Sequence, residues 1–251
     1  MNVPPEPDAG VEDLRDRIER AARVCLLSGA GMSAESGIAT FRDALTGLWS
    51  RFDPAQLASE DGFRADPRLV WDWYAERREG VRAAEPNAGH HALAAFAQRR
   101  PGVLTIVTQN VDDLHQRAGN TDTIRLHGDI LRDRWLERCG QGLACDVAKA
   151  KPGRPPRCGD CGNPLRPAVV WFGEMLPAGA IEAAEQSARS CDVMLVVGTS
   201  GAVWPAAGLA AHARRAGAFV AIVNPHPTEI DAEAHRLLQG TAATLLPRLF
   251  A

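Results

Sequence analysis

The fold is decided by residues 27–43, which read Leu27-Ser-Gly-Ala-Gly-Met-Ser-Ala-Glu-Ser-Gly-Ile-Ala-Thr-Phe-Arg-Asp43. The preceding run, Val24-Cys25-Leu26-Leu27, is short, apolar and partly β-branched, which predicts a buried strand. The chain then turns at Gly29-Ala30-Gly31, and Ser33 can cap the helix that follows. A strand, a glycine turn and a helix start together present backbone N–H groups to a phosphate. On this motif alone, a tight turn without a ligand is about as well supported.

Composition limits the classes of protein to consider. The chain has 251 residues, enough for one large α/β domain or one domain with a small insert. Its net charge of −3 gives no electrostatic support for general binding of nucleic acid. No apolar run approaches the roughly 18 residues of a membrane span, and the polar, proline-rich N-terminus resembles neither a signal peptide nor a transit peptide. We therefore expect a cytoplasmic protein, and a monomer.

In all, strands are expected at 23–28, 103–108, 123–126, 192–197 and 218–223, alternating with helices. This alternation predicts an α/β fold, a Rossmann-like parallel sheet with helices on both faces. Polar residues follow several of these strands at the carboxyl end, where open α/β sheets bind ligands. They are Gln109, Asn110 and Asp112; His127 with Gly128; Gly198, Thr199 and Ser200; and Asn224 with Pro225.

Four cysteines lie within 23 positions, which in a reducing compartment suggests a metal site rather than disulfides. Cys158-Gly-Asp-Cys161 has the spacing of a zinc knuckle, whereas Cys139 and Cys145 have five residues between them. We expect Zn²⁺ bound by all four. A degenerate site with only Cys158 and Cys161 is the alternative. A metal held by four thiolates is structural, because no coordination position remains open for water.

Residues 67–84 read as a helix that begins at Pro67, a favoured first position. Tyr74 and Arg77 are three residues apart and therefore share a face. From the pattern alone, an apolar stripe of Trp71 and Tyr74 beside a solvated Arg77 is favoured about two to one over a binding role.

Five motifs in the same order resemble the sirtuins, the NAD-dependent protein lysine deacylases. Residues 29–42 follow the family's GAGxSxxSGIPxFR, with Ala39 in place of the common proline, and residues 108–119 follow TQNxDxLHxxAG. His127-Gly128, the RPxVVWFGE segment ending at Glu174 and the GTS at Gly198 complete the set. The resemblance covers roughly residues 20–248. The family usually has C-x-x-C about eight residues after the histidine, and Trp135 and Arg138 stand there instead.

The resemblance implies an enzyme that uses NAD to take acetyl groups, and also succinyl or malonyl groups, from protein lysines, with release of nicotinamide and O-acyl-ADP-ribose. His127 would be the general base, assisted by Asn110 and Asp112, since a histidine near its ordinary pKa can accept a proton at neutral pH. NAD would contact Gly29, Ala30, Gly31, Ala34, Glu35, Phe41, Arg42, Gln109, Asn110, Asp112, Gly198, Thr199, Ser200, Asn224, Pro225 and Ala242.

The substrate residues are also implied by the resemblance. In sirtuins of the desuccinylase type, a helix with Tyr-x-x-Arg holds an acidic acyl group, and Tyr74 and Arg77 match that pattern. The acylated peptide would pair as an added strand with Val170, Trp171, Phe172 and Gly173 on one side and Val203 on the other. The expected partners are acylated-lysine proteins or peptides, without nucleic acid or membrane.

The expected organisation is a single catalytic domain over 1–251. Its Rossmann-like part would comprise about 10–43, 86–128 and 168–251, with a helical insert at about 44–85 and a zinc module at about 129–167. Two other classes remain open. One is a dehydrogenase, although residues 44–66 show no second strand ending in an acidic ribose ligand. The other is a non-catalytic NAD-binding or zinc-ribbon module, which the set of Gln109, Asn110, Asp112 and His127 argues against.

Overall fold

The structure is a computed structural model that describes residues 7–39, 52–137 and 145–251. The chain forms two compact units. Unit 1 comprises Met1–Thr40, Ala84–Leu126 and Leu176–Ala251, and unit 2 comprises Phe41–Ala83 and His127–Met175.

Unit 1 is built on a six-stranded parallel sheet in the order β3-β2-β1-β6-β7-β8. The chain moves outward from β1 to β2 and β3 on one side, and from β6 to β7 and β8 on the other. The switch point between the two halves therefore lies between β1 and β6, which is where this topology binds ligands. The strands are β1 (Val24–Ser28), β2 (Leu104–Thr108), β3 (Ile124–Arg125), β6 (Val193–Val197), β7 (Phe219–Asn224) and β8 (Arg236–Gln239).

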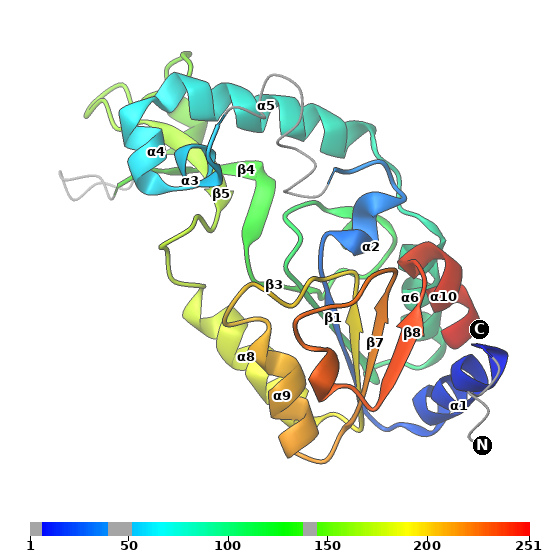
Figure 1. Cartoon of the computed structure of the whole chain (residues 1–251). Helices are drawn as coiled ribbons and strands as arrows, with labels where there is room; N and C mark the ends of the chain where they lie inside the picture. Colours follow the sequence, from blue (N-terminus) through cyan, green and yellow to red (C-terminus); the bar gives the residue numbers. More distant parts are fainter. Residues whose placement is uncertain (1–6, 40–51, 138–144) are drawn as a thin grey trace. The chain divides into compact units, whose positions relative to one another are not determined.

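The sheet is covered on both faces because its strands are apolar on both faces. Alternate residues of β1 and β6, such as Leu26 and Leu195, pack with one set of helices, and Leu27 and Val196 pack with the other. In Figure 1 the first set lies on the right of the sheet and the second on its lower left. The first set is α1 (Pro7–Arg20), α6 (Ala88–Arg99) and α10 (Ala242–Leu249); the second is α8 (Ala178–Ser190) and α9 (Gly208–Arg215). The predicted fold class is confirmed.

Short elements connect these layers in unit 1. The glycine turn leads into α2 (Gly31–Ala34), and β2 is followed by α7 (Leu114–Arg117). The 3₁₀ helix η3 (Asp231–Glu233) precedes β8.

Unit 2 consists of helices beside a two-stranded antiparallel sheet. The sheet pairs β4 (Gly128–Trp135) with β5 (Leu165–Val169), with a register shift between Asp129 and Asp133. Gly128 has φ +83, and a Cβ there would lie 2.2 Å from the Ala168 oxygen, so only glycine fits this start of β4. The helices are α3 (Pro54–Leu57), α4 (Glu60–Ala65), α5 (Pro67–Ala83) and the 3₁₀ helix η2 (Val147–Lys149).

Two expectations about local structure are wrong. The sequence of residues 231–251 predicts a short helix and then a closing helix. The closing helix is present as α10, but Arg236–Gln239 pairs in parallel with β7 as the edge strand β8. Ser33 was expected to cap a helix, but it lies inside α2, where Ala30 occupies the N-cap position and no side chain caps the helix. The hydroxyl of Ser33 instead bonds to side chains that follow β2, as described next.

Candidate functional site

Two glycine turns touch at the switch point of the sheet in unit 1. The Gly31 N–H donates to the Gly198 oxygen at 2.7 Å. A Cβ on Gly29 would lie 2.6 Å from the Thr199 Cβ, and one on Gly198 would lie 2.4 Å from the Met32 nitrogen. Gly198 also has φ +61, a conformation that side chains disfavour. The turns after β1 and β6 are therefore interlocked, and bulkier residues would separate them.

Hydrogen bonds between polar side chains join these two glycine turns to the residues that follow β2. Gln109 donates from Nε2 to Thr199 Oγ1 at 3.1 Å, so the two predicted cofactor residues lie in contact. Asn110 donates from Nδ2 to Ser33 Oγ at 3.1 Å, and Ser33 Oγ donates to Asp112 Oδ2 at 3.0 Å. The structure thus brings Asn110 and Asp112 together through Ser33, a residue that sequence reasoning had assigned to a cap. Its position within the glycine motif was the signal for a role at this site.

Asp112 is only 6% exposed. Burial raises the pKa of Asp112, while the Leu114 N–H and the Ser33 hydroxyl, which both bond to the carboxylate, lower it. The carboxyl group is therefore held at a fixed position beside Asn110, with less preference for the charged form than in water. Such a group can accept a hydrogen bond from a ligand amide.

The other predicted cofactor residues of unit 1 lie at ends of strands or helices. Glu35 accepts a bond from the Ala243 N–H at 3.0 Å, next to the buried Ala242 at the start of α10. Asn224 ends β7 and donates to the His226 oxygen at 2.6 Å, and Pro225 accepts from Gln239. Ala30 is the N-cap residue of α2 and Ala34 its last residue, and Ser200 is exposed after β6. Phe41 and Arg42 lie outside the described residues.

In unit 2, His127 directly precedes β4, and its backbone oxygen accepts from the Val170 N–H at 2.9 Å. The segment predicted to contact the peptide thus runs beside the predicted base. Within it, Phe172 is 54% exposed and Trp171 only 2%. Val203, predicted for the other side of the peptide, belongs to unit 1 and is 42% exposed.

Tyr74 and Arg77 lie on α5, whose rotation is fixed by Arg78. Arg78 donates from Nε to the Ile130 oxygen at 2.6 Å and pairs with Asp133 at 2.5 Å. Tyr74 is 5% exposed, and its hydroxyl accepts a bond from Trp171 Nε1 at 3.0 Å. Arg77 lies over the ring of Trp73, at 4.7 Å from the centroid.

The electrostatics of this pair suit an anion. Burial raises the pKa of Tyr74 to about 12, although the charge of Arg77 lowers it, so the phenol keeps its proton at neutral pH. Burial also lowers the pKa of Arg77, partly offset by Tyr74. A cation that has lost water in this way gains from an anion brought to it. The pair can therefore offer a positive charge and an O–H donor to one carboxylate.

Three cysteines of unit 2 form a candidate metal centre. The ligand atoms of Cys145, Cys158 and Cys161 all lie within 4.8 Å of one another, with Sγ–Sγ distances of 3.3 Å from Cys158 to Cys145 and 3.9 Å from Cys145 to Cys161. Zinc with thiolates at 2.3 Å in a tetrahedron requires about 3.8 Å between sulfurs. The three thiols therefore fit a structural zinc site.

Two further features support that centre. The backbone N–H groups of Cys161 and Asp160 lower the pKa of Cys158 to about 7, which favours the thiolate that binds metal. Trp135, which stands where the family usually has a cysteine, donates from Nε1 to the Cys145 oxygen at 2.6 Å. Cys139, the fourth predicted ligand, lies outside the described residues.

Comparisons with known proteins agree with this arrangement. The Sir2 family profile matches residues 29–205, more than half of the chain. The chain belongs to the Sir2 family. It is 55% identical over 234 residues to the NAD-dependent protein deacylase of Ralstonia nicotianae, with 93% of each chain covered.

Solved structures of the family have the same fold. A Sir2 homologue in complex with NAD matches with a TM-score of 0.84 and 42% identity, covering 95% of this chain and 92% of that one. A Sir2 structure bound to a propionylated peptide matches with a TM-score of 0.81 and 29% identity, covering 95% and 96%. The predicted family is confirmed, and with it the class of enzyme that its relatives' names describe, the NAD-dependent protein deacylases.

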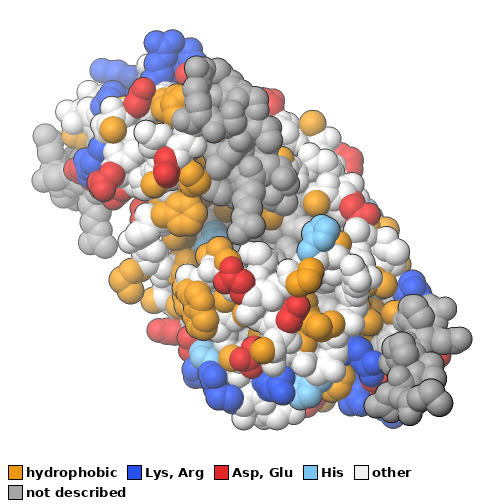
Figure 2. Space-filling model, viewed as in Figure 1, with side chains coloured by type: hydrophobic (Ala, Val, Ile, Leu, Met, Phe, Trp, Pro, Cys, Tyr) orange, Lys and Arg blue, Asp and Glu red, His pale blue; other side chains and the backbone are white. Residues whose placement is uncertain are grey.

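Two further observations concern the helices and the surface. Among the described helices, none is both long enough and apolar enough to cross a bilayer. On the face shown in Figure 2, both acidic and basic side chains are exposed.

Proposed function

We propose that this protein removes acyl groups from lysines of proteins or peptides with NAD as co-substrate, and that it prefers acidic acyl groups, succinyl above acetyl. The observation that carries the first part is the interlocked pair of glycine turns beside Gln109, Asn110 and Asp112. The turns bring glycine backbone and the hydroxyls of Thr199 and Ser200 to the switch point, a setting suited to a dinucleotide.

When bound, NAD supplies a ribose carbon that loses nicotinamide and a hydroxyl that takes the acyl group. The chain's own residues position and protect this exchange. Asn110 and Asp112, held by Ser33, would fix the amide of the nicotinamide. His127 would accept the proton of the ribose hydroxyl and so activate it. The N–H and C=O groups of the segment from Val170 to Gly173 would pair with the peptide backbone.

The acyl preference rests on α5. Arg77 can hold a carboxylate in bidentate fashion, and the Tyr74 hydroxyl can donate one further bond. Charge-assisted hydrogen bonds contribute about 1.5–3 kcal/mol net, which corresponds to roughly ten- to hundredfold discrimination. An acetyl group offers no anion to this pair, so we expect it to be the weaker substrate.

The runner-up function, a dehydrogenase, is less well supported. In the described part of the chain, the strand beside β1 in that half of the sheet is β2, and Gln109 and Asn110 follow it. Dehydrogenases bind the ribose there with an acidic residue. Here two amides come first, and the carboxylate of Asp112, further on, already accepts bonds from the Ser33 hydroxyl and the Leu114 N–H, which favours recognition of the nicotinamide over that mode of ribose binding.

The test is mass spectrometry of one peptide carrying acetyl-, succinyl- or glutaryl-lysine, incubated with the protein with and without NAD. We expect free lysine only with NAD, one nicotinamide per lysine freed, and faster turnover of the acidic acyl groups. Removal of the acyl group without NAD would contradict the proposed activity. NAD-dependent turnover with acetyl-lysine preferred would keep the activity and contradict the acyl preference.

A further inference from the structure

Trp171 lies in the segment expected to pair with the substrate, yet its side chain turns inward. It is 2% exposed, whereas its neighbour Phe172 is 54% exposed. The indole N–H donates to the Tyr74 hydroxyl at 3.0 Å, and the two rings lie 6.5 Å apart at 41°. Trp171 therefore connects the backbone segment that would bind the peptide with the side chain of Tyr74, which would bind the acyl group.

The direction of this hydrogen bond has a consequence for Tyr74. An indole nitrogen can only donate, so the tyrosine oxygen is the acceptor. The phenol must then donate its own proton to something other than Trp171. The bond thus orients the Tyr74 O–H as a donor, which is what a carboxylate ligand requires.

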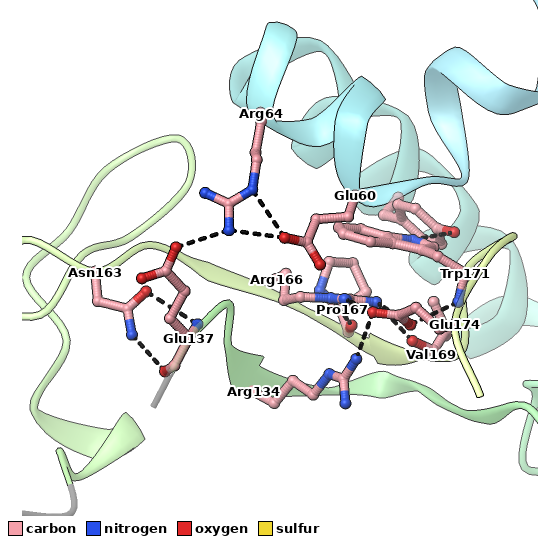
Figure 3. A network of polar contacts seen from close by, with 11 residues as sticks. Glu60, Arg64, Arg134, Glu137, Asn163, Arg166, Pro167, Val169, Trp171 and Glu174 are labelled. Carbon is pink, nitrogen blue, oxygen red and sulfur yellow. Dashed lines mark hydrogen bonds and ion pairs between the residues drawn. The ribbon is translucent and has the colours of Figure 1, made fainter. Parts of the chain in front are cut away.

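Trp171 is itself held by a buried ion pair. The guanidinium of Arg166, 1% exposed, lies over the indole ring at 3.2 Å from its centroid. Both terminal nitrogens of Arg166 bond to the Glu174 carboxylate, and one of them also donates to the Val169 oxygen at 2.7 Å. Glu174 in turn accepts the Trp171 backbone N–H at 2.8 Å. Figure 3 shows this arrangement, with the carboxylate between the arginines and the Trp171 backbone.

Glu174 pairs with two arginines, Arg166, which is buried, and Arg134, which is exposed. Burial raises the pKa of Glu174, but the bonds from Arg166 and the Trp171 N–H outweigh burial, so the pKa of Glu174 lies below its ordinary value. Arg134 also bonds to Glu174, at 2.9 Å, but its side chain is 50% exposed. Arg166 and Glu174 therefore form the desolvated pair that fixes the indole, and Arg134 contributes at the periphery.

We propose that Trp171 is a positioning residue for acyl selectivity, that it acts by orienting the Tyr74 hydroxyl, and that Arg166 and Glu174 hold it in place. This proposal rests on the proposed preference for acidic acyl groups. An ordinary structural role for Trp171 would instead lower stability, or the turnover of every acylated peptide, without changing the ratio between them.

The test is a double-mutant cycle with Trp171→Phe, which keeps a ring beneath Arg166 and removes the N–H, and Tyr74→Phe. For each protein, kcat/KM is measured on succinyl- and acetyl-lysine versions of one peptide at saturating NAD, with the midpoint of thermal unfolding. We expect Trp171→Phe to lower the succinyl-to-acetyl ratio by about three- to tenfold, mainly through KM for the succinyl peptide. The double variant should match Tyr74→Phe alone, because the N–H acts through the hydroxyl.

A matched pair of variants tests the ion pair. Glu174→Gln should lower the same ratio, whereas Arg134→Gln, which removes only the exposed partner, should leave it unchanged. If the wild-type enzyme prefers succinyl-lysine but Trp171→Phe leaves the ratio unchanged, or the cycle is additive, the positioning role is wrong. If the wild-type enzyme shows no such preference, the proposed acyl preference itself has failed, and this role fails with it.

Discussion

The two units of this protein use different chemistry to hold their candidate sites. In unit 1, hydrogen bonds between hydroxyls and amides join Gln109 to Thr199 and Asn110 to Ser33 at the carboxyl end of a sheet. In unit 2, Arg166 and Glu174 form a largely buried ion pair, and three thiols form a candidate metal centre. The difference follows from the cores: a six-stranded sheet packed on both faces can position short side chains, whereas a two-stranded sheet is marginal without other support.

The largest expected effect follows removal of the metal, and it should be confined to unit 2. Structural zinc contributes about 10–16 kcal/mol to folding in small zinc peptides, and unit 2 has little sheet of its own. Removing zinc with a chelator, or changing Cys158→Ser, should disorder the surroundings of Cys145 and Cys161 while the parallel sheet of unit 1 persists.

Hydrogen exchange with and without chelator measures this effect. Exchange should accelerate around β4 and β5, and the amides of β1 and β6 should stay protected. Uniform loss of protection across both sheets would show that the units do not differ in this way. Elemental analysis that finds no zinc in fresh protein would contradict the metal centre.

His127→Ala should lower kcat by about 10²–10⁴, the usual contribution of a general base. The fold of unit 2 should be retained, because the bond from the Val170 N–H to the backbone oxygen of residue 127 is kept in this variant. Binding of NAD, measured by calorimetry, should be largely unchanged. Activity within tenfold of the wild type would contradict the role of this histidine.

A smaller expected effect is a dependence of the free energy of unfolding on pH, caused by two histidines of unit 1. Burial, together with the neighbouring His91, lowers the pKa of His90 to about 4. Burial, together with the neighbouring His90 and Arg125, lowers the pKa of His115 to about 3. Their rings lie 4.9 Å apart, and His115 Nε2 lies 3.0 Å from Ser28 Oγ at the end of β1. Both must be neutral in the folded state, whereas in the unfolded chain they take up protons near pH 6.5.

The free energy of unfolding should therefore be unaffected by these histidines above about pH 6.5 and fall as the pH drops toward 4. The slope is at most about 1.4 kcal/mol per pH unit for each histidine. Urea unfolding at pH 7, 6 and 5 measures it. His115→Gln should reduce the slope relative to wild type, whereas His226→Gln, at an exposed position, should leave it unchanged. Equal slopes in all three proteins would contradict this account.

Much of unit 1 could be predicted from sequence because its signals are local. Apolar runs such as Val193–Val197 are read directly as strands, and the polar residues after them must meet at one edge. The strand β8 could not be predicted, because Arg236-Leu-Leu-Gln239 carries no strand pattern of its own and becomes a strand by pairing with β7. Ser33 was misassigned for the same reason: its partners Asn110 and Asp112 are distant in sequence.

The predictions for unit 2 depended more on the resemblance to the sirtuin family. The periodicity of α5 favoured packing over binding for Tyr74, and the side chain is indeed buried. Only the resemblance to sirtuins suggested an acyl site there. The inward turn of Trp171 and its bond to Tyr74 had no sequence signal, because alternation along an irregular segment does not say which side chain faces inward. The predictions for Cys139, Phe41 and Arg42 lie outside the described residues.

The central claim is that α5 selects the acyl group, and Arg77→Met tests it most directly. Methionine keeps an unbranched apolar stem, is shorter than arginine, and removes the guanidinium charge. At saturating NAD, kcat/KM for a succinyl-lysine peptide should fall about ten- to hundredfold, while that for the acetyl-lysine peptide stays unchanged or rises. An equal fall on the two peptides would contradict the claim and show that Arg77 serves the packing of α5 alone.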